Sequence, residues 1–343
     1  MEQKAPATSL RTSLRKSILT SLAIGLAVVI VISLFSDLRA VGNDLLSFDW
    51  MLLPLILVGT IINYWLRWLK WDYYLRYLKL DRNIDRSTSG LIFTAGLVMS
   101  VTPGKMGEVL KSFLLRQRNG TAISRSAPIV LAERLTDGIA MLLLMGLGLT
   151  LYPPARPLFI VLVLLTIAGI VIVQRQALAL SIIRFVACLP FGQRVAPRLE
   201  TIYTTTAQLL HWRILLVSTL ISVVSWGFEC VAFFFVLMGV GSDPSWLLLL
   251  QATFIFAAST LFGLVSFLPG GLGASEVSSV GLLVALVGLS ASAATTATIV
   301  IRFCTLWFGV LLGVIALAWL SRRSATAGVQ DDVTSLSDVS EVL

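Results

Sequence analysis

Charge, histidine and cysteine are scarce in this 343-residue chain. Charged residues make up 13% of it and hydrophobic residues 57%, whereas ordinary soluble domains are about 25% charged. Cys188, Cys230 and Cys304 lie far apart, which argues against a zinc site and against a disulfide framework. The single histidine, His211, excludes a His-rich metal site or a catalytic pair of histidines. We therefore expect no bound metal ion and no cofactor.

Several sequence motifs of enzymes are also missing. The sequence contains no Gly-x-Ser-x-Gly motif, P-loop, dinucleotide-binding fingerprint or Asp-rich metal motif. An ATP-driven pump is therefore excluded unless a partner supplies the ATPase. We expect that the protein is not an enzyme, although spacing alone leaves a pair of catalytic carboxylates open.

Long apolar segments, in contrast, are spread over most of the chain, and the mean hydropathy is +0.91. A helix of about 20 residues crosses the hydrocarbon core of a bilayer. The pattern predicts an all-α integral membrane protein that forms a polytopic bundle. The expected apolar segments are residues 17–35, 50–69, 88–101, 127–151, 158–173, 214–240, 247–268, 277–289 and 291–320.

Two of the apolar regions are interrupted by similar Pro-Gly motifs. The first break contains Pro103, Gly104, Lys105, Gly107 and Glu108, and the second contains Pro269, Gly270, Gly271, Gly273 and Glu276. An arginine follows each break inside a later apolar segment. Non-helical backbone at membrane depth is tolerated where protein buries it or where it lines a wet cavity. We therefore expect a broken re-entrant helical hairpin near residues 88–117 and another near 247–289.

The basic residues predict the orientation of the chain. With both termini in the cytoplasm, most of the 26 lysines and arginines fall on the cytoplasmic side. The two hairpins then enter from opposite sides, so the halves form inverted repeats, which are typical of transporters. Alternatively, the glycines reflect only close helix packing. The expected regions are a basic N-terminus (1–16), a first repeat (17–175), a cytoplasmic linker (176–212), a second repeat (213–323) and a disordered acidic tail (324–343).

Ionisable residues within apolar spans are costly and usually face a cavity or a charged partner. The candidate substrate-pathway residues are Lys105, Glu108, Glu133, Arg134, Asp137, Glu276 and Arg302. Helix N-termini and arginines both suit phosphate, so Lys105, Arg134 and Arg302 are expected to hold an anionic head group. In the competing interpretation, Arg134 pairs with Asp137 or Glu108, and Arg302 pairs with Glu276 or Glu229. Both interpretations can hold together.

An aromatic and basic cluster, Trp65 to Trp71 with Arg67 and Lys70, ends the segment 50–69. Such clusters are typical of the membrane interface, and we interpret this one as an anchor. The alternative is a contact with a lipid head group at the mouth of a cavity.

Three motifs, at residues 102–111, 133–138 and 269–276, together resemble the lysylphosphatidylglycerol synthase transmembrane-region family. The resemblance covers about residues 19–320 and implies a flippase-like fold in the bacterial inner membrane. It also implies a substrate-pathway role for the two breaks and for the intramembrane charges named above, which match the motifs. In two-part relatives a soluble domain attaches lysine to phosphatidylglycerol. That domain has no counterpart in this sequence, so synthase activity is not expected.

The sequence thus predicts a flippase that moves an amphiphile with a phosphate-bearing head group between leaflets. The expected partner is a membrane lipid and not nucleic acid, while a second copy of the chain or a cytoplasmic synthase stays open. The alternatives are a membrane-embedded enzyme, or an enzyme subunit, acting on a lipid-linked substrate, and a scaffold for a cytoplasmic lipid synthase.

Overall fold

The computed structural model describes residues 38–101, 109–175, 181, 192–266, 268–320 and 322. The predicted span 17–35, the N-terminus and the acidic tail lie outside the described residues. So does the first break, with Pro103, Gly104, Lys105, Gly107 and Glu108.

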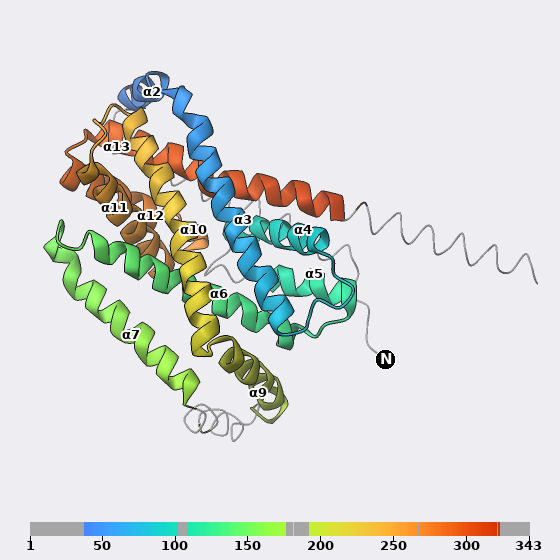
Figure 1. The fold of residues 1–343 in the computed structure, drawn as a ribbon. Coiled ribbons are helices and arrows are strands. Elements are labelled where there is room, and N and C mark those ends of the chain that lie inside the picture. The colour runs from blue at the N-terminus through green and yellow to red at the C-terminus, as the bar shows by residue number, and fades with distance from the viewer. Residues whose placement is uncertain are drawn as a thin grey trace, which may run out of the picture.

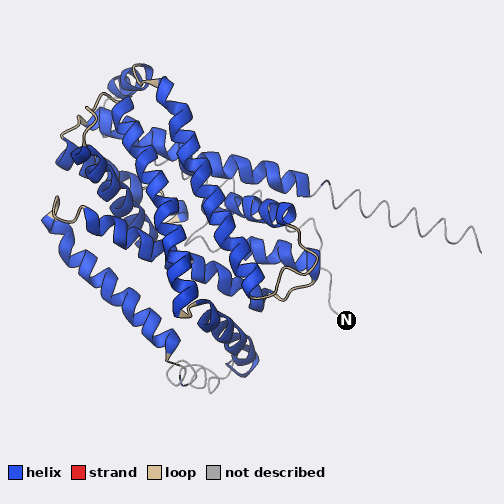
Figure 2. Ribbon diagram, in the orientation of Figure 1, coloured by secondary structure: helices blue, strands red, loops and turns tan. Residues whose placement is uncertain are grey.

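All regular elements in the described part of the chain are helical (Figure 2). The first half contains α2 (Leu38–Leu46), η1 (Trp50–Leu52), α3 (Leu53–Tyr77), α4 (Arg86–Gly96), η2 (Leu97–Val101), α5 (Leu110–Asn119), α6 (Ile123–Leu147), η4 (Pro153–Ala155) and α7 (Arg156–Gln174). The second half contains α9 (Gly192–Leu209), α10 (Trp212–Gly239), α11 (Trp246–Val265), η5 (Pro269–Gly271), α12 (Ala274–Leu282), the π-turn η6 (Leu283–Val287), α13 (Ala291–Arg302) and the π-turn η7 (Phe303–Trp307).

Five helices among the described residues are long and apolar enough to cross a bilayer. They are Trp50–Tyr77, Pro153–Gln174, Trp212–Gly239, Trp246–Val265 and Ala291–Leu320. The expected all-α, multi-pass membrane fold is therefore confirmed. The inverted relation of the two halves and the re-entrant hairpins stay predictions.

Helix α6, with 25 residues, is similar in length to these five helices, but its middle carries the charged residues Glu133, Arg134 and Asp137. It lies inside the bundle and packs against α3, α5, α7, α9, α10 and α11. In Figure 1, α6 runs behind α10, and α7 forms an outer edge of the molecule. Because neighbouring helices surround α6, its charged middle is enclosed by protein rather than by lipid.

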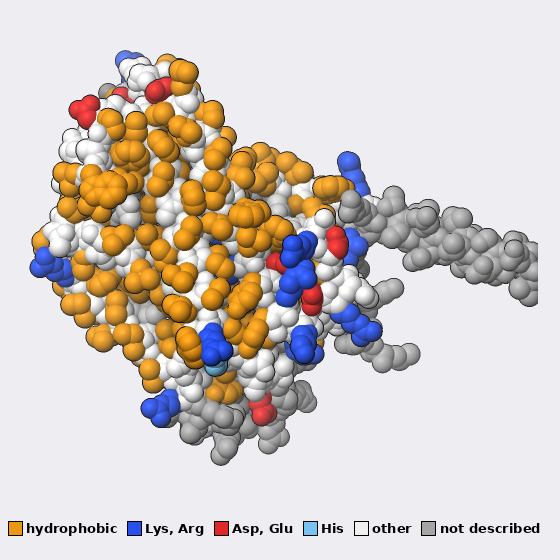
Figure 3. All heavy atoms as spheres, in the orientation of Figure 1, with side chains coloured by type: hydrophobic (Ala, Val, Ile, Leu, Met, Phe, Trp, Pro, Cys, Tyr) orange, Lys and Arg blue, Asp and Glu red, His pale blue; other side chains and the backbone are white. Residues whose placement is uncertain are grey.

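Hydrophobic side chains cover the middle of the face seen in Figure 3. Lys and Arg side chains gather toward its lower and right-hand margins, where some acidic side chains lie among them, and further acidic and basic side chains lie at the top near α2. Helix α7 illustrates this surface, because none of its residues is buried and Leu164 and Leu165 are each at least 60% exposed. An apolar band between charged ends is what a bilayer requires.

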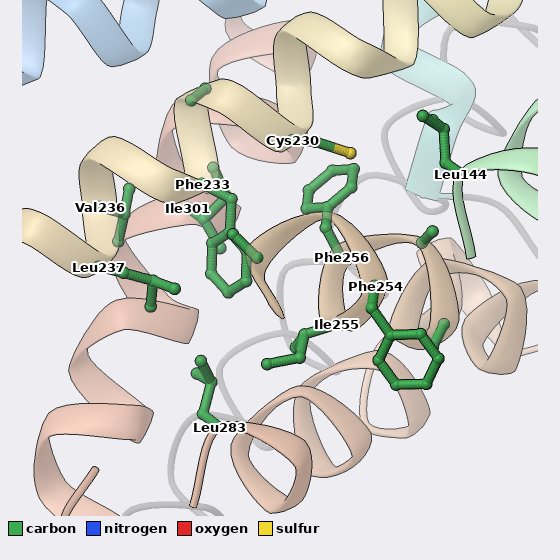
Figure 4. Packing of buried hydrophobic residues seen from close by; sticks show 14 of the residues in the cluster. Leu144, Cys230, Phe233, Val236, Leu237, Phe254, Ile255, Phe256, Leu283 and Ile301 are labelled. Carbon is green, nitrogen blue, oxygen red and sulfur yellow. The ribbon is translucent and has the colours of Figure 1, made fainter. Parts of the chain in front are cut away.

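The apolar core lies between α10, α11 and α13, and Figure 4 shows part of it. Phe233 of α10 faces Phe256 of α11, with ring centroids 5.9 Å apart. Ile301 of α13 belongs to the same buried cluster. These contacts hold α10 beside the helices that carry the second break.

Candidate functional site

Helix α6 supplies two buried carboxylates, and each meets a lysine from another helix. Glu133 Oε2 accepts from Lys111 Nζ of α5 at 2.5 Å, and both side chains are at most 3% exposed. Lys111 Nζ also lies 4.7 Å from the ring centroid of Trp71. Lys111 is not among the candidate residues that the sequence indicated, and its charge is compensated inside the bundle.

Asp137, one turn further along α6, has two basic partners. Lys70 Nζ of α3 donates to Asp137 Oδ1 at 2.6 Å and to Ser222 Oγ of α10 at 2.7 Å. Arg134 Nη2 lies 3.4 Å from Asp137 Oδ2, so the pairing of Arg134 with Asp137 forms. The interpretation of Lys70 as an interfacial anchor is wrong, since Lys70 is 1% exposed and joins three helices.

The second intramembrane arginine is bound to the second break. Arg302 Nε lies 2.7 Å from Glu276 Oε1, which selects Glu276 over Glu229 as its partner among the described residues. Glu276 Oε2 accepts from the Gly273 backbone N–H at 2.6 Å. Glu276 therefore connects the backbone of the break to the guanidinium on α13.

The break needs glycine for two reasons. Gly270, Gly271 and Gly273 have φ of 62°, 69° and 89°, a region that side chains with a Cβ rarely adopt. The chain also returns close to α11, where a Cβ placed on Gly263 would lie 1.9 Å from Ser275 Oγ and 3.2 Å from the Gly271 Cα. The glycines thus allow α12 to pack directly against α11.

Arg134 and Arg302, which lie in different halves of the chain, line one cavity of about 60 Å³. We call it the Arg134 cavity; Asp137, Gly270 and Gly271 are also in its wall. The remainder of its wall is mostly apolar and includes Leu264 and Leu268. Those two side chains are 38% and 45% exposed, so the wall continues onto the apolar outer surface.

A second cavity, of about 90 Å³, shares Arg302, Trp226 and Thr260 with the first. We call it the Glu229 cavity, because Glu229 of α10 is its buried carboxylate. Arg67 of α3 also lines it. The two cavities meet at Arg302, which therefore faces both.

Comparison with known proteins agrees with this architecture. The family model described as the lysylphosphatidylglycerol synthase TM region matches residues 21–313. The chain belongs to this family. The resemblance inferred from the three sequence motifs is therefore confirmed.

Two relatives of this member of the lysylphosphatidylglycerol synthase TM-region family are UPF0104 membrane proteins. One, from Methanothermobacter thermautotrophicus, is 28% identical over 285 residues, which cover 78% of this chain and 83% of the relative. The other, from Pyrococcus horikoshii, is 22% identical over 292 residues, which cover 77% of this chain and 85% of the relative. Their names give a membrane location and no activity.

In this family member, the structure brings together Arg134, Asp137, Glu276 and Arg302 around the second break. Glu133 is on the same helix but points to Lys111. Lys105 and Glu108 lie outside the described residues. Among the residues that the structure describes, no group of three or more His, Cys, Asp or Glu side chains is placed to hold a metal ion.

Sequence reasoning missed Arg67 as a residue of the interior. A signal was present, because Thr60, Asn63, Arg67, Lys70 and Tyr74 follow one another at steps of three or four residues along α3. That spacing places them on one face of a helix. All five are buried, so this face of a membrane-spanning helix is a polar stripe turned toward the bundle.

Proposed function

We propose that the protein moves an amphiphile with a phosphate-bearing head group between the two leaflets of the membrane. The observation that carries the proposal is the shared cavity of Arg134 and Arg302 beside the glycine break. Arginine binds phosphate oxygens with two parallel N–H donors. A phosphate entering this cavity would meet one arginine from each half of the protein.

The charge around the Arg134 cavity supports an anionic ligand. Two arginines and one carboxylate, Arg134, Arg302 and Asp137, are the charged side chains that line the cavity among the described residues. Two guanidinium groups therefore border the space that a ligand would occupy. Intramembrane charge of this kind is costly without a compensating partner, and ionisable groups within spans usually mark a substrate or ion pathway.

The apolar part of the wall supports a lipid rather than a free anion. Leu264 and Leu268 line the Arg134 cavity and are also exposed on the outside of the bundle. An amphiphile can thus place its head group beside the arginines while its chains stay among lipid-facing side chains. The lipid would need no fully aqueous path through the protein.

The test is transfer of head-group-labelled phosphatidylglycerol, and of a labelled polyprenyl phosphate, between the leaflets of proteoliposomes. We expect Arg134→Gln and Arg302→Gln to lose protein-dependent transfer. Arg156→Gln, a matched change at an exposed residue at the start of α7, should keep it. Full transfer by both cavity variants, or no transfer of either lipid by the folded wild type, would overturn the proposal.

Two further measurements separate the alternatives. We expect no chemical change of the lipid, so a new product detected by mass spectrometry would favour the membrane-embedded enzyme. A scaffold for a cytoplasmic synthase would lose its function when residues 324–343 are deleted, whereas a flippase should tolerate that deletion.

A further inference from the structure

Glu229 is a buried carboxylate of α10 that forms no ion pair with any residue the structure describes. The residue is 2% exposed and lies inside the membrane-spanning helix Trp212–Gly239. Its hydrogen-bond donor is the hydroxyl of Thr60, at 3.5 Å from Glu229 Oε2. Glu133, Asp137 and Glu276, by comparison, each have a basic partner. A carboxylate in an apolar interior is either paired or takes up a proton.

Arg67 is a buried cation in the wall of the same cavity. It is 8% exposed, and its guanidinium carbon lies 5.3 Å from the ring centroid of Trp226. No ion pair joins it to a carboxylate within the described ranges. Stacking on an aromatic ring leaves the edge of a guanidinium available for hydrogen bonds to an anion. The indole N–H of Trp226 is also buried, without a hydrogen-bond acceptor in the described part of the chain.

The interior of the Glu229 cavity is polar enough to hold water or a phosphate. Seven serine and threonine residues line it, together with Arg67, Glu229 and Arg302. Its volume of about 90 Å³ accommodates several water molecules, since one water needs about 10–15 Å³ by this measure. The Glu229 cavity adjoins the Arg134 cavity at Arg302. A phosphate bound in one cavity would therefore have the other cavity next to it.

Charge balance decides which ligands the Glu229 cavity can take. When Glu229 is ionised, Arg67 and Arg302 contribute two positive charges, and Glu229 and Glu276, the partner of Arg302, contribute two negative charges. A phosphate diester then adds one negative charge that these four side chains do not balance. One proton on Glu229 restores neutrality, because the carboxylate becomes a neutral acid. Binding of the anion and of the proton are therefore coupled.

The surroundings of Glu229 contain few other groups that could take this proton. From α3 it faces Arg67 and Tyr64, whose hydroxyl donates to the Thr305 carbonyl oxygen. From α13 and η7 it faces Arg302, and Cys304 lies nearby. On α10 its neighbour is Cys230. Asp137 of α6, the partner of Lys70 of α3 and of Arg134, contacts Ser222 of α10, about two helical turns before Glu229. Helix α11 and η1 carry no titratable side chain.

We propose that the Glu229 cavity binds the phosphate of a lipid head group at Arg67 and Arg302 together with one proton on Glu229. This rests on the proposed function and gives it an energy source. Lipid and proton enter and leave the cavity together, so a proton gradient drives the lipid in the direction of proton flow. No covalent bond is made or broken apart from the O–H bond of the carboxyl group.

Isothermal titration calorimetry of dihexanoyl phosphatidylglycerol binding to the full-length protein in detergent tests this coupling. The lipid is a phosphate diester and does not titrate near neutral pH, so any proton taken up belongs to the protein. Binding heats in two buffers of different ionisation enthalpy give the number of protons. Wild type should take up about one proton per bound lipid at a pH where the empty cavity is ionised. Its affinity should fall about tenfold per pH unit above that point.

Two variants separate the roles of the carboxylate and the arginine. Glu229→Gln is isosteric and permanently neutral, so it should bind the lipid without proton uptake and with an affinity independent of pH. Arg67→Gln should bind the lipid at least about tenfold more weakly than wild type, because a charge-assisted hydrogen bond is lost. The matched controls are Glu200→Gln and Arg82→Gln, which change exposed residues outside both cavities and should behave as wild type.

Wild-type binding without proton uptake at every pH where the protein stays folded would overturn the proposal, and this needs no variant. Unchanged proton uptake by folded Glu229→Gln would overturn it as well. Dimethyl phosphate carries the same diester without acyl chains, and equal affinity for it would overturn the assignment to a lipid. If lipid transfer in vesicles depends on Arg134 but takes up no proton, only this inference fails and the proposed function stands.

Discussion

Lys70 Nζ lies 2.6 Å from Asp137 Oδ1 and ties α3 to α6 in the middle of the bundle. Ser222 of α10 completes the contact, since its hydroxyl donates to the same carboxylate oxygen at 3.0 Å. Because Lys70 takes Oδ1, Arg134 approaches the other oxygen at 3.4 Å and stays in the wall of its cavity. Lys70 and Arg134 thereby share the two oxygens of one carboxylate, and Ser222 fixes its position.

Replacing Lys70 by Met should therefore destabilise the protein by about 3–5 kcal/mol, because Asp137 loses its shorter ion pair in a buried place. Thermal unfolding in detergent micelles measures the effect. Lys79→Met, which changes an exposed lysine just after α3, is the matched control and should unfold like wild type. Equal stability of the two variants would show that the Lys70–Asp137 pair does not hold the helices together.

The pair between Lys111 and Glu133 allows a second test of buried charge. Lys111→Met alone should cost about 3–5 kcal/mol, because it leaves the carboxylate of Glu133 without its ion pair. Adding Glu133→Leu should recover most of that loss, since two apolar side chains can replace a buried ion pair at little cost. A double variant as unstable as the single one would mean that packing, and not charge, explains the loss.

The close approach of α11 and α12 predicts an effect of a single methyl group. Gly263→Ala should destabilise by about 1–3 kcal/mol, because its Cβ would overlap Ser275 Oγ. Gly281→Ala on α12 is the control: no atom lies within 4 Å of its added Cβ, and alanine favours the helix. The unfolding temperatures of the two variants and of wild type are compared. If Gly263→Ala unfolds at the same temperature as wild type, α12 does not pack against α11 in this way.

The apolar wall of the Arg134 cavity predicts where a lipid enters. Leu264→Trp should slow lipid transfer in proteoliposomes, because the larger ring narrows the wall between the arginines and the outer surface. Protein stability should hardly change, since Leu264 is 38% exposed. Leu247→Trp makes the same change at an exposed residue at the start of α11. Transfer as fast in Leu264→Trp as in Leu247→Trp would exclude this entrance.

Several parts of the fold could be predicted from the sequence. The apolar segments expected at 127–151, 158–173 and 214–240 correspond to α6, α7 and α10 within a few residues. Hydropathy succeeds here because a bilayer demands long apolar helices with paired backbone groups. The predicted segment 50–69 ends too early, because α3 continues to Tyr77. Arg67 and Lys70 on this helix are buried in the interior.

The candidate site was predicted in part. The sequence identified Arg134, Arg302 and the glycine break because charge and Pro-Gly motifs are unusual within apolar segments. It could not choose between Glu276 and Glu229 as the partner of Arg302, because that choice depends on how α12 and α10 approach α13. It also interpreted Lys70 as part of an interfacial anchor, because lysines at the membrane edge and buried lysines look alike when each segment is read alone.

The sequence by itself determined that this is a multi-pass helical membrane protein of the lysylphosphatidylglycerol synthase TM-region family. Composition and local motifs suffice for that, since hydrophobicity and helix breaks act within one segment at a time. Only the tertiary structure decided that two arginines from different halves line one cavity, and that Glu229, which has no ion pair with a described residue, lines the next cavity together with Arg67. Such placements arise from contacts between segments distant in the sequence, and the energy of a buried charge depends on those contacts.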